Sequence, residues 1–155
     1  MLSANEFTTG SIGHAAPLTL VLPRRAHEET ILIGGSAENP VAFFLSGTHR
    51  FRSFEATNNG SWFGLLIPDV RVEVDETSAF DSRYGQSRAG AVLRLDTRLV
   101  AQETGFAAQL VTLEDGLPTT SDGSVGFSRW HIVLGSGQEK RVLHVVSIDE
   151  VQSVP

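Results

Sequence analysis

Four carboxylates lie close together in one part of the chain, and their types and spacing are the first to suggest chemistry. They are Asp69, Glu73, Asp75 and Glu76. Paired carboxylates serve as acid and base when their environments separate their pKa values, and they also bind divalent cations. The segment Val70–Asp75 alternates valine with polar residues, which is typical of a strand with one solvated face. We therefore interpret these carboxylates as a solvated strand face, with a catalytic or cation site as the alternative.

Two histidines in the C-terminal part of the chain form the second candidate site. If Ser136 and Gly137 are the centre of a hairpin turn, Arg129, His131 and His144 share one face of the hairpin. Imidazoles are common zinc ligands, although zinc requires three or four ligands in all. The sequence thus offers His131 and His144 as two metal ligands or acid–base groups, against two histidines on a half-exposed strand.

A polar loop with embedded aromatic and arginine residues is the third candidate. The segment Phe80–Arg88 reads FDSRYGQSR. Aromatic and arginine side chains are enriched at binding hot spots. Phe80, Arg83 and Tyr84 are therefore candidate binding residues, and the alternative is a surface loop anchored by Phe80.

The elements that must position these residues are strands, because the dominant hydrophobic period is two. Turn residues separate the apolar segments, and only Thr104–Leu113 has helical spacing, although this segment fits another strand equally well. We expect one all-β domain over residues 1–155, an antiparallel barrel or sandwich of roughly 8–10 short strands with at most one short helix and a loosely ordered segment at 1–14. The expected strands are Leu18–Leu22, Thr30–Ile33, Val41–Leu45, Arg50–Ala56, Ser61–Ile67, Val70–Asp75, Gly90–Gln102, Ser124–Leu134 and Lys140–Ile148.

The dipeptide Asn59-Gly60 predicts a type I′ turn that joins Arg50–Ala56 and Ser61–Ile67 as a hairpin, since both residues tolerate positive φ. The predicted core residues of this hairpin and of the other expected strands are Phe54, Phe63, Leu65, Val72, Val74, Leu93, Leu95, Leu143 and Val145. Trp62 and Leu66 then lie on the opposite face, where bare apolar surface is unfavourable. We expect Trp62 to be buried by a subunit contact or by a second layer of the domain.

The segment Asn59–Gly64, NGSWFG, matches the [DN]-x-S-x-x-G element of PilZ domains. It resembles that family, whose small β-barrels bind cyclic dinucleotides, and the resemblance implies such binding as a weaker functional alternative. The family's second element, R-x-x-x-R, lies upstream and holds the ligand through arginine. Here the upstream pairs Arg24-Arg25 and Arg50-x-Arg52 lack that spacing, and a tight turn explains the Asn and Gly without a ligand.

Composition narrows the function classes. The chain has 155 residues and no cysteine, which excludes disulfides, thiolate nucleophiles and cysteine-based zinc sites. A formal charge of −6 disfavours general nucleic-acid binding, which needs a basic face. The first residues lack the basic and apolar regions of a signal peptide, and no apolar run reaches the roughly 18 residues of a membrane span. We expect a cytoplasmic protein.

Because no catalytic motif is complete, the sequence favours a non-enzymatic β-module that binds a protein partner, including copies of itself. Surplus apolar residues around Trp62 and Leu66 support this hypothesis, since edge strands must be covered or paired. The alternative is a barrel, with or without enzymatic activity, that binds a small molecule or a metal ion through His131, His144 and nearby carboxylates.

Overall fold

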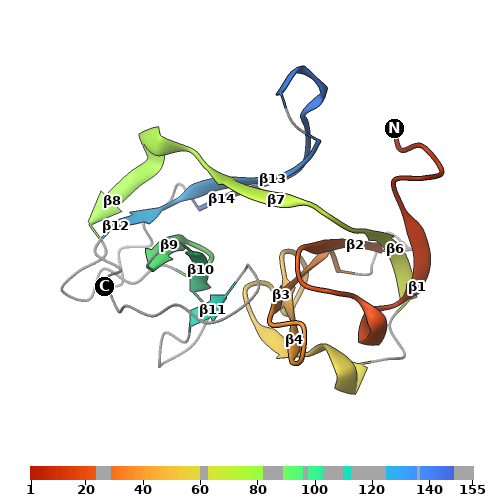
Figure 1. Cartoon of the computed structure of the whole chain (residues 1–155). Helices are drawn as coiled ribbons and strands as arrows, with labels where there is room; N and C mark the ends of the chain where they lie inside the picture. Colours follow the sequence, from red (N-terminus) through yellow and green to blue (C-terminus); the bar gives the residue numbers. More distant parts are fainter. Residues whose placement is uncertain are drawn as a thin grey trace.

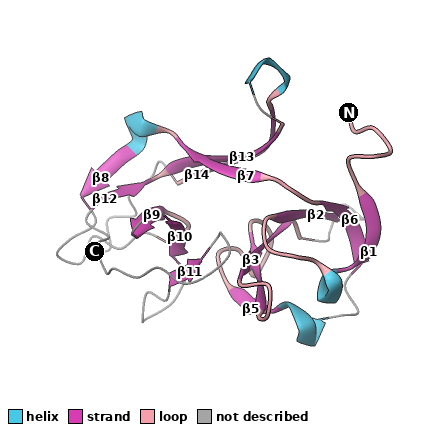
Figure 2. Cartoon of the chain, in the orientation of Figure 1, coloured by secondary structure: helices cyan, strands magenta, loops and turns pink. Residues whose placement is uncertain are grey.

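The computed structural model describes most of the chain. The described residues are 1–23, 29–59, 63–81, 89–95, 98–102, 110–112, 125–135 and 137–148, and within strands β9–β11 only the backbone is described, apart from the buried side chain of Val92. They form a sandwich-like all-β fold of three antiparallel sheets, which do not close into a barrel (Figure 1). Among these residues the only helical segments are short 3₁₀ turns, shown in Figure 2, and no helix is long and apolar enough to cross a membrane.

The largest sheet has six strands in the order β1-β6-β2-β3-β4-β5. Their bounds are β1 Thr8–Ser11, β2 Thr19–Pro23, β3 Ile31–Gly35, β4 Pro40–Phe44, β5 Ser53–Glu55 and β6 Phe63–Ile67. The central strand β3 is apolar at successive positions, because both of its faces are covered. The 3₁₀ turns η1 (Ile12–His14) and η2 (Ala56–Asn59) lie on one face of this sheet.

Two smaller sheets complete the fold. The five-stranded sheet has the order β11-β10-β9-β12-β8, and the three-stranded sheet has the order β14-β13-β7. Their strands are β7 Arg71–Val74, β8 Ala79–Asp81, β9 Val92–Leu95, β10 Arg98–Gln102, β11 Leu110–Thr112, β12 Val125–Phe127, β13 Arg129–Leu134 and β14 Arg141–Ser147, with 3₁₀ turns η3 Glu76–Ser78 and η4 Gly137–Glu139. In Figure 1 the strands β7 and β13 run along the upper side of the molecule, and the six-stranded sheet lies below them.

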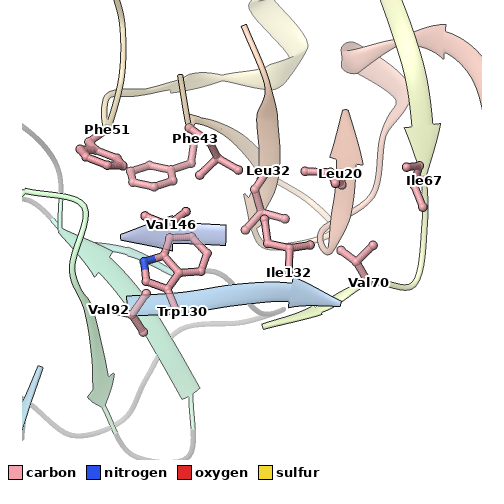
Figure 3. Close-up of a cluster of buried hydrophobic side chains, with 11 residues drawn as sticks. Leu20, Leu32, Phe43, Phe51, Ile67, Val70, Val92, Trp130, Ile132 and Val146 are labelled. Carbon is pink, nitrogen blue, oxygen red and sulfur yellow. The ribbon is translucent and has the colours of Figure 1, made fainter. Parts of the chain in front are cut away.

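The main core fills the space between the six-stranded and three-stranded sheets (Figure 3). Trp130 lies at its centre, and its Nε1–H donates to the carbonyl of Gly90 at 2.9 Å. The rings of Phe43 and Phe51 stack with centroids 6.2 Å apart. The buried members of this cluster are Leu20, Leu32, Phe43, Leu45, Phe51, Ile67, Val70, Val92, Trp130, Ile132 and Val146.

A second cluster covers the other face of the six-stranded sheet, beneath η1 and η2. Its buried members are Ile12, Ala15, Val21, Ile31, Ile33, Ala42, Phe44 and Ala56. Because Ile12 belongs to this cluster and residues 8–11 form an edge strand, the N-terminal segment is more structured than expected.

The predicted hairpin around Asn59-Gly60 is wrong. Strand β5 pairs with β4, and β6 pairs with β1 and β2, while Ala56–Asn59 forms a 3₁₀ turn. The buried Ala56 packs in the second cluster, and this contact directs the chain after β5 away from a two-residue hairpin turn. The turn dipeptide therefore marks a real break in the strands but not a hairpin.

The core prediction is correct only in part. Val72, Val74 and Leu143 pack against the main core and Leu65 is half-buried, whereas Phe54, Phe63 and Val145 are exposed. The side chains of Leu93 and Leu95 lie outside the described residues. The sequence of residues 104–113 fits a helix or a strand, and their described part, Leu110–Thr112, is strand β11. The three exposed residues share one cause, which is a wrong strand register or pairing.

Candidate functional site

The outer face of the three-stranded sheet is set by the register of its central strand β13. His131 pairs with Glu73 on one side and Val145 on the other, and Val133 pairs with Arg71 and Val142. Directly paired residues project from the same face of a sheet. Trp130 and Ile132 point into the core, so His131 and Val133, which alternate with them along β13, point outward together with their pairing partners.

Three valines on this face form an apolar stripe, which we define as Val133, Val142 and Val145. Val142 and Val145 are each 49% exposed, whereas Val133, between charged neighbours, is 0% exposed. The exposed pair lies on β14, which is an edge strand of its sheet as described. Solvent therefore reaches the stripe at Val142 and Val145.

Charged side chains surround the valine stripe and neutralise one another. Lys140 Nζ donates to Glu73 Oε1 at 2.9 Å, and Arg71 Nη2 lies 3.7 Å from Glu73 Oε2. Arg71 also donates to the carbonyl of Gly135 at 2.6 Å. At the other end of β7, Arg129 Nη1 donates to Asp75 Oδ2 at 3.1 Å. The face therefore has an apolar centre and a paired, charged rim.

Two of the four candidate carboxylates, Glu73 and Asp75, make structural contacts, whereas Asp69 and Glu76 are exposed. Asp75 Oδ1 accepts from the hydroxyl of Thr77 at 2.6 Å and from its N–H at 2.9 Å, which caps η3. These hydrogen bonds, with Arg129, hold the pKa of Asp75 below its usual value. Glu73 has two cationic partners. Among the described residues no group of three or more His, Asp or Glu side chains is placed to hold a metal ion.

The expected common face for His131 and His144 is wrong. The hairpin forms, but its register shifts between Ile132 and Val133, and His144 pairs with Ile132 while His131 pairs with Val145. Neighbouring positions along a strand point to opposite faces, so His131 points outward and His144 points toward the core. A β-bulge at Leu143 causes the shift, and the metal hypothesis loses the geometry on which it rested.

Burial, and secondarily the charge of Arg50, lowers the pKa of His144. Between that lowered value and the ordinary one of about 6.5 the unfolded chain binds more protons, so stability must fall as the pH drops through this window. We expect His144→Gln to flatten the pH dependence of the free energy of unfolding as the pH falls below about 6.5. Urea titrations of both proteins at several pH values measure this, and equal slopes would contradict it.

The remaining predicted binding residues are not brought together by the described structure. Trp62, Arg83 and Tyr84 lie outside the described residues. Leu66 is half-buried and packs against the second cluster, so it stabilises the domain itself. Phe80 is half-buried in β8, opposite Gly126.

A buried carboxylate that the sequence analysis did not single out lies at the end of the six-stranded sheet. Glu29 accepts three hydrogen bonds at Oε1, from His49 Nδ1 at 3.1 Å, the His49 N–H at 3.0 Å and Thr48 Oγ1 at 3.2 Å. The partners are 20 residues apart, and Gly47 makes the approach possible because a Cβ there would lie 2.4 Å from Glu29 Cγ. An acidic residue directly before an apolar strand was the only sequence signal.

Comparison with known proteins places the chain in a family. Residues 9–154 match the family model described as "Uncharacterised protein y4lG". The chain belongs to the y4lG family. The protein "Uncharacterized protein y4lG" of Sinorhizobium fredii (strain NBRC 101917 / NGR234) is 48% identical over 147 residues, which cover 92% of this chain and 91% of that protein. No solved structure matches the chain.

The family match extends over both regions described above. It begins at residue 9, in β1, and ends after β14, so the valine stripe and the Glu29–His49 pair both lie within the y4lG family region. The two regions belong to one family unit, and each can be tested in the same protein.

Proposed function

We propose that this protein is a non-enzymatic β-module that assembles with a second copy of itself through the outer face of β7, β13 and β14. The observation that carries the proposal is the valine stripe, with Val142 and Val145 each half-exposed on one edge strand. Half-exposed neighbouring valines gain free energy when a partner removes them from water. An apolar centre with a charged rim is also the usual anatomy of a protein interface.

The charge of this face supports a second copy as the partner. The rim contains three cations (Arg71, Arg129 and Lys140) and two carboxylates (Glu73 and Asp75), whereas the whole chain has a formal charge of −6. The acidic net charge makes two copies repel each other on average, but on this face both signs are present on each side. A two-fold axis through the stripe brings the cations of one copy to the carboxylates of the other.

The bulge in β14 favours contact through the face of the sheet over pairing of strand edges. It interrupts the regular ladder between Ile132 and Val133, and bulges of this kind blunt an edge strand against further pairing. The valine side chains project from the sheet and remain available. We therefore expect two sheets stacked face to face, about 10 Å apart.

Replacing Val145 with lysine tests the proposal, since it places two like charges at the centre of the two-fold contact. We expect sedimentation equilibrium to show a dimer for the unmodified protein and a dissociation constant raised by at least about tenfold for Val145→Lys. Thermal melting should change little, because position 145 is half-exposed in the isolated chain.

Val125→Lys is the matched control. Val125 is 45% exposed on β12, away from the stripe, and receives the same substitution in the same kind of environment. It should leave the dissociation constant unchanged. The proposal is overturned if the unmodified protein is monomeric at several hundred micromolar, a concentration at which even weak dimers with dissociation constants of about that size form. It is also overturned if the two lysine variants change the dissociation constant equally.

A further inference from the structure

A second surface lies at the turn between β4 and β5, on the face of the six-stranded sheet that η1 and η2 cover in part. The site, which we call the β4–β5 corner, consists of His49, Arg52 and Phe54. It is independent of the valine stripe, because the main core separates the two sheets that carry them.

Glu29 orients the imidazole at this corner. The carboxylate is 8% exposed and binds His49 Nδ1, while the His49 side chain is 45% exposed. Fixing Nδ1 against a carboxylate sets the orientation of the ring and leaves Nε2 as the outward nitrogen. The other oxygen, Oε2, is buried and has no hydrogen-bond partner in the part of the chain that the structure describes.

An unusual bulge directs Arg52 to the same face. Phe51 N–H donates to the carbonyl of Phe44 at 2.7 Å, and Phe44 N–H donates to the carbonyl of Arg52 at 2.9 Å. This is the pattern of a bulge whose first residue is normally a left-handed glycine, and Phe51 occupies that position with φ 63°. Arg52 is thus placed opposite Phe44, on the face where Phe44 packs.

Phe54 supplies the apolar part of the corner. It is 38% exposed, and its ring meets His49 and Phe44 edge-on, with centroids 5.6 and 5.3 Å apart. These contacts fix the ring orientation and leave part of its surface to solvent. Arg52 is exposed and has no side-chain ion pair with any other described residue, so its guanidinium is available.

We infer that His49, Arg52 and Phe54 bind an oxyanion carried on an aromatic group, such as an aryl phosphate or carboxylate. Protonated His49 donates from Nε2, and the fork of Arg52 donates two parallel hydrogen bonds to a phosphate or carboxylate. The site brings two basic side chains, His49 and Arg52, beside one carboxylate, Glu29, and this basic excess favours an anion on an otherwise acidic protein. The aromatic group then lies against the exposed part of Phe54.

The test uses phenyl phosphate and inorganic phosphate as probes and follows the ring nitrogens of His49 by NMR in histidine-labelled full-length protein. We expect the chemical shift of the His49 Nε2 resonance to change saturably with both probes. Phenyl phosphate should bind more tightly than inorganic phosphate. Arg52→Gln should weaken both about tenfold, because a charge-assisted contact is lost. Arg141→Gln, a control on the three-stranded sheet whose side chain pairs with Glu6, should leave both unchanged.

Two further variants separate the roles within the corner. Phe54→Leu should weaken phenyl phosphate and leave inorganic phosphate unchanged, since only the aryl group meets the ring. Glu29→Gln should change the balance between the Nδ1–H and Nε2–H forms of His49 before any probe is added. If Glu29→Gln does not fold, the Arg52 and Phe54 variants decide alone.

The inference is overturned if the His49 shift with phenyl phosphate does not saturate, or if Arg52→Gln and Arg141→Gln bind equally. It is also overturned if Phe54→Leu weakens both probes to the same extent, because the aryl group would then have no place in the site. None of these outcomes depends on assembly, which the lysine variant at position 145 tests separately.

Discussion

Replacing Trp130 with alanine should lower the free energy of unfolding by about 3–5 kcal/mol. Trp130 is 0% exposed and lies between Val92 and Val146 in the centre of the main core (Figure 3). Its removal leaves a large cavity between two rigid sheets, which cannot collapse to fill it. Urea or guanidinium titration followed by far-ultraviolet circular dichroism measures the loss.

Trp130→Phe separates packing from hydrogen bonding at the same site. The phenyl ring keeps much of the volume but removes the donor to the carbonyl of Gly90, whose buried oxygen then costs about 1–3 kcal/mol. Phe63→Ala is the control, because that side chain is exposed on β6 and should cost less than about 1 kcal/mol. Comparable losses from Trp130→Ala and Phe63→Ala would show that the cluster is not the main core.

The strand content could be predicted from the sequence because alternation is a local property. Val72 and Val74 alternate with charged residues, and they pack inward on β7 as the period requires. The same argument located most other strands to within a few residues. Fold class therefore followed from patterns that span fewer than ten residues.

Register could not be predicted in the same way, because one extra residue reverses every face beyond it. The bulge at Leu143 turns His144 inward and Val145 outward, so both positions contradict a regular hairpin. No local pattern distinguishes the bulged strand from a straight one. The valine stripe, which carries the proposed assembly, is visible only once this bulge is known.

The β4–β5 corner was hidden for a different reason. Glu29 and His49 are 20 residues apart, and their contact depends on the left-handed Gly47, with φ 81°, and on the pairing of β3 with β4. A sequence shows residue types at such separations but not which of them meet. Long-range contacts of this kind carry most of the chemistry in an all-β fold.

Gly90→Ala should destabilise the protein by about 3 kcal/mol or more, from two separable causes. Gly90 has φ 85°, and an alanine in the left-handed region costs about 1–2 kcal/mol. The added Cβ would also lie 2.4 Å from Cε2 and Cζ of Phe51, and overpacking costs typically 1–3 kcal/mol. Chemical denaturation gives the total.

Gly137→Ala isolates the backbone cost. Gly137 also has positive φ, at 60°, but a Cβ there would meet no atom within 4 Å, so only about 1–2 kcal/mol should be lost. The difference between the two alanine variants measures the clash with Phe51. In a double-mutant cycle Phe51→Leu should remove part of that difference, because leucine lacks the Cε2 and Cζ atoms.

The cycle matters beyond stability, because Phe51 is the left-handed residue of the bulge that places Arg52. Phe51 retains this conformation because its ring is buried against Gly90 and Phe43, which offsets the backbone cost. If Gly90→Ala displaces the Phe51 ring, Arg52 should move with it. Phenyl phosphate should then bind more weakly to the Gly90→Ala variant than to the Gly137→Ala variant. Equal stability and equal binding in the two alanine variants would show that the Phe51 ring moves freely and that its burial does not hold the corner in place.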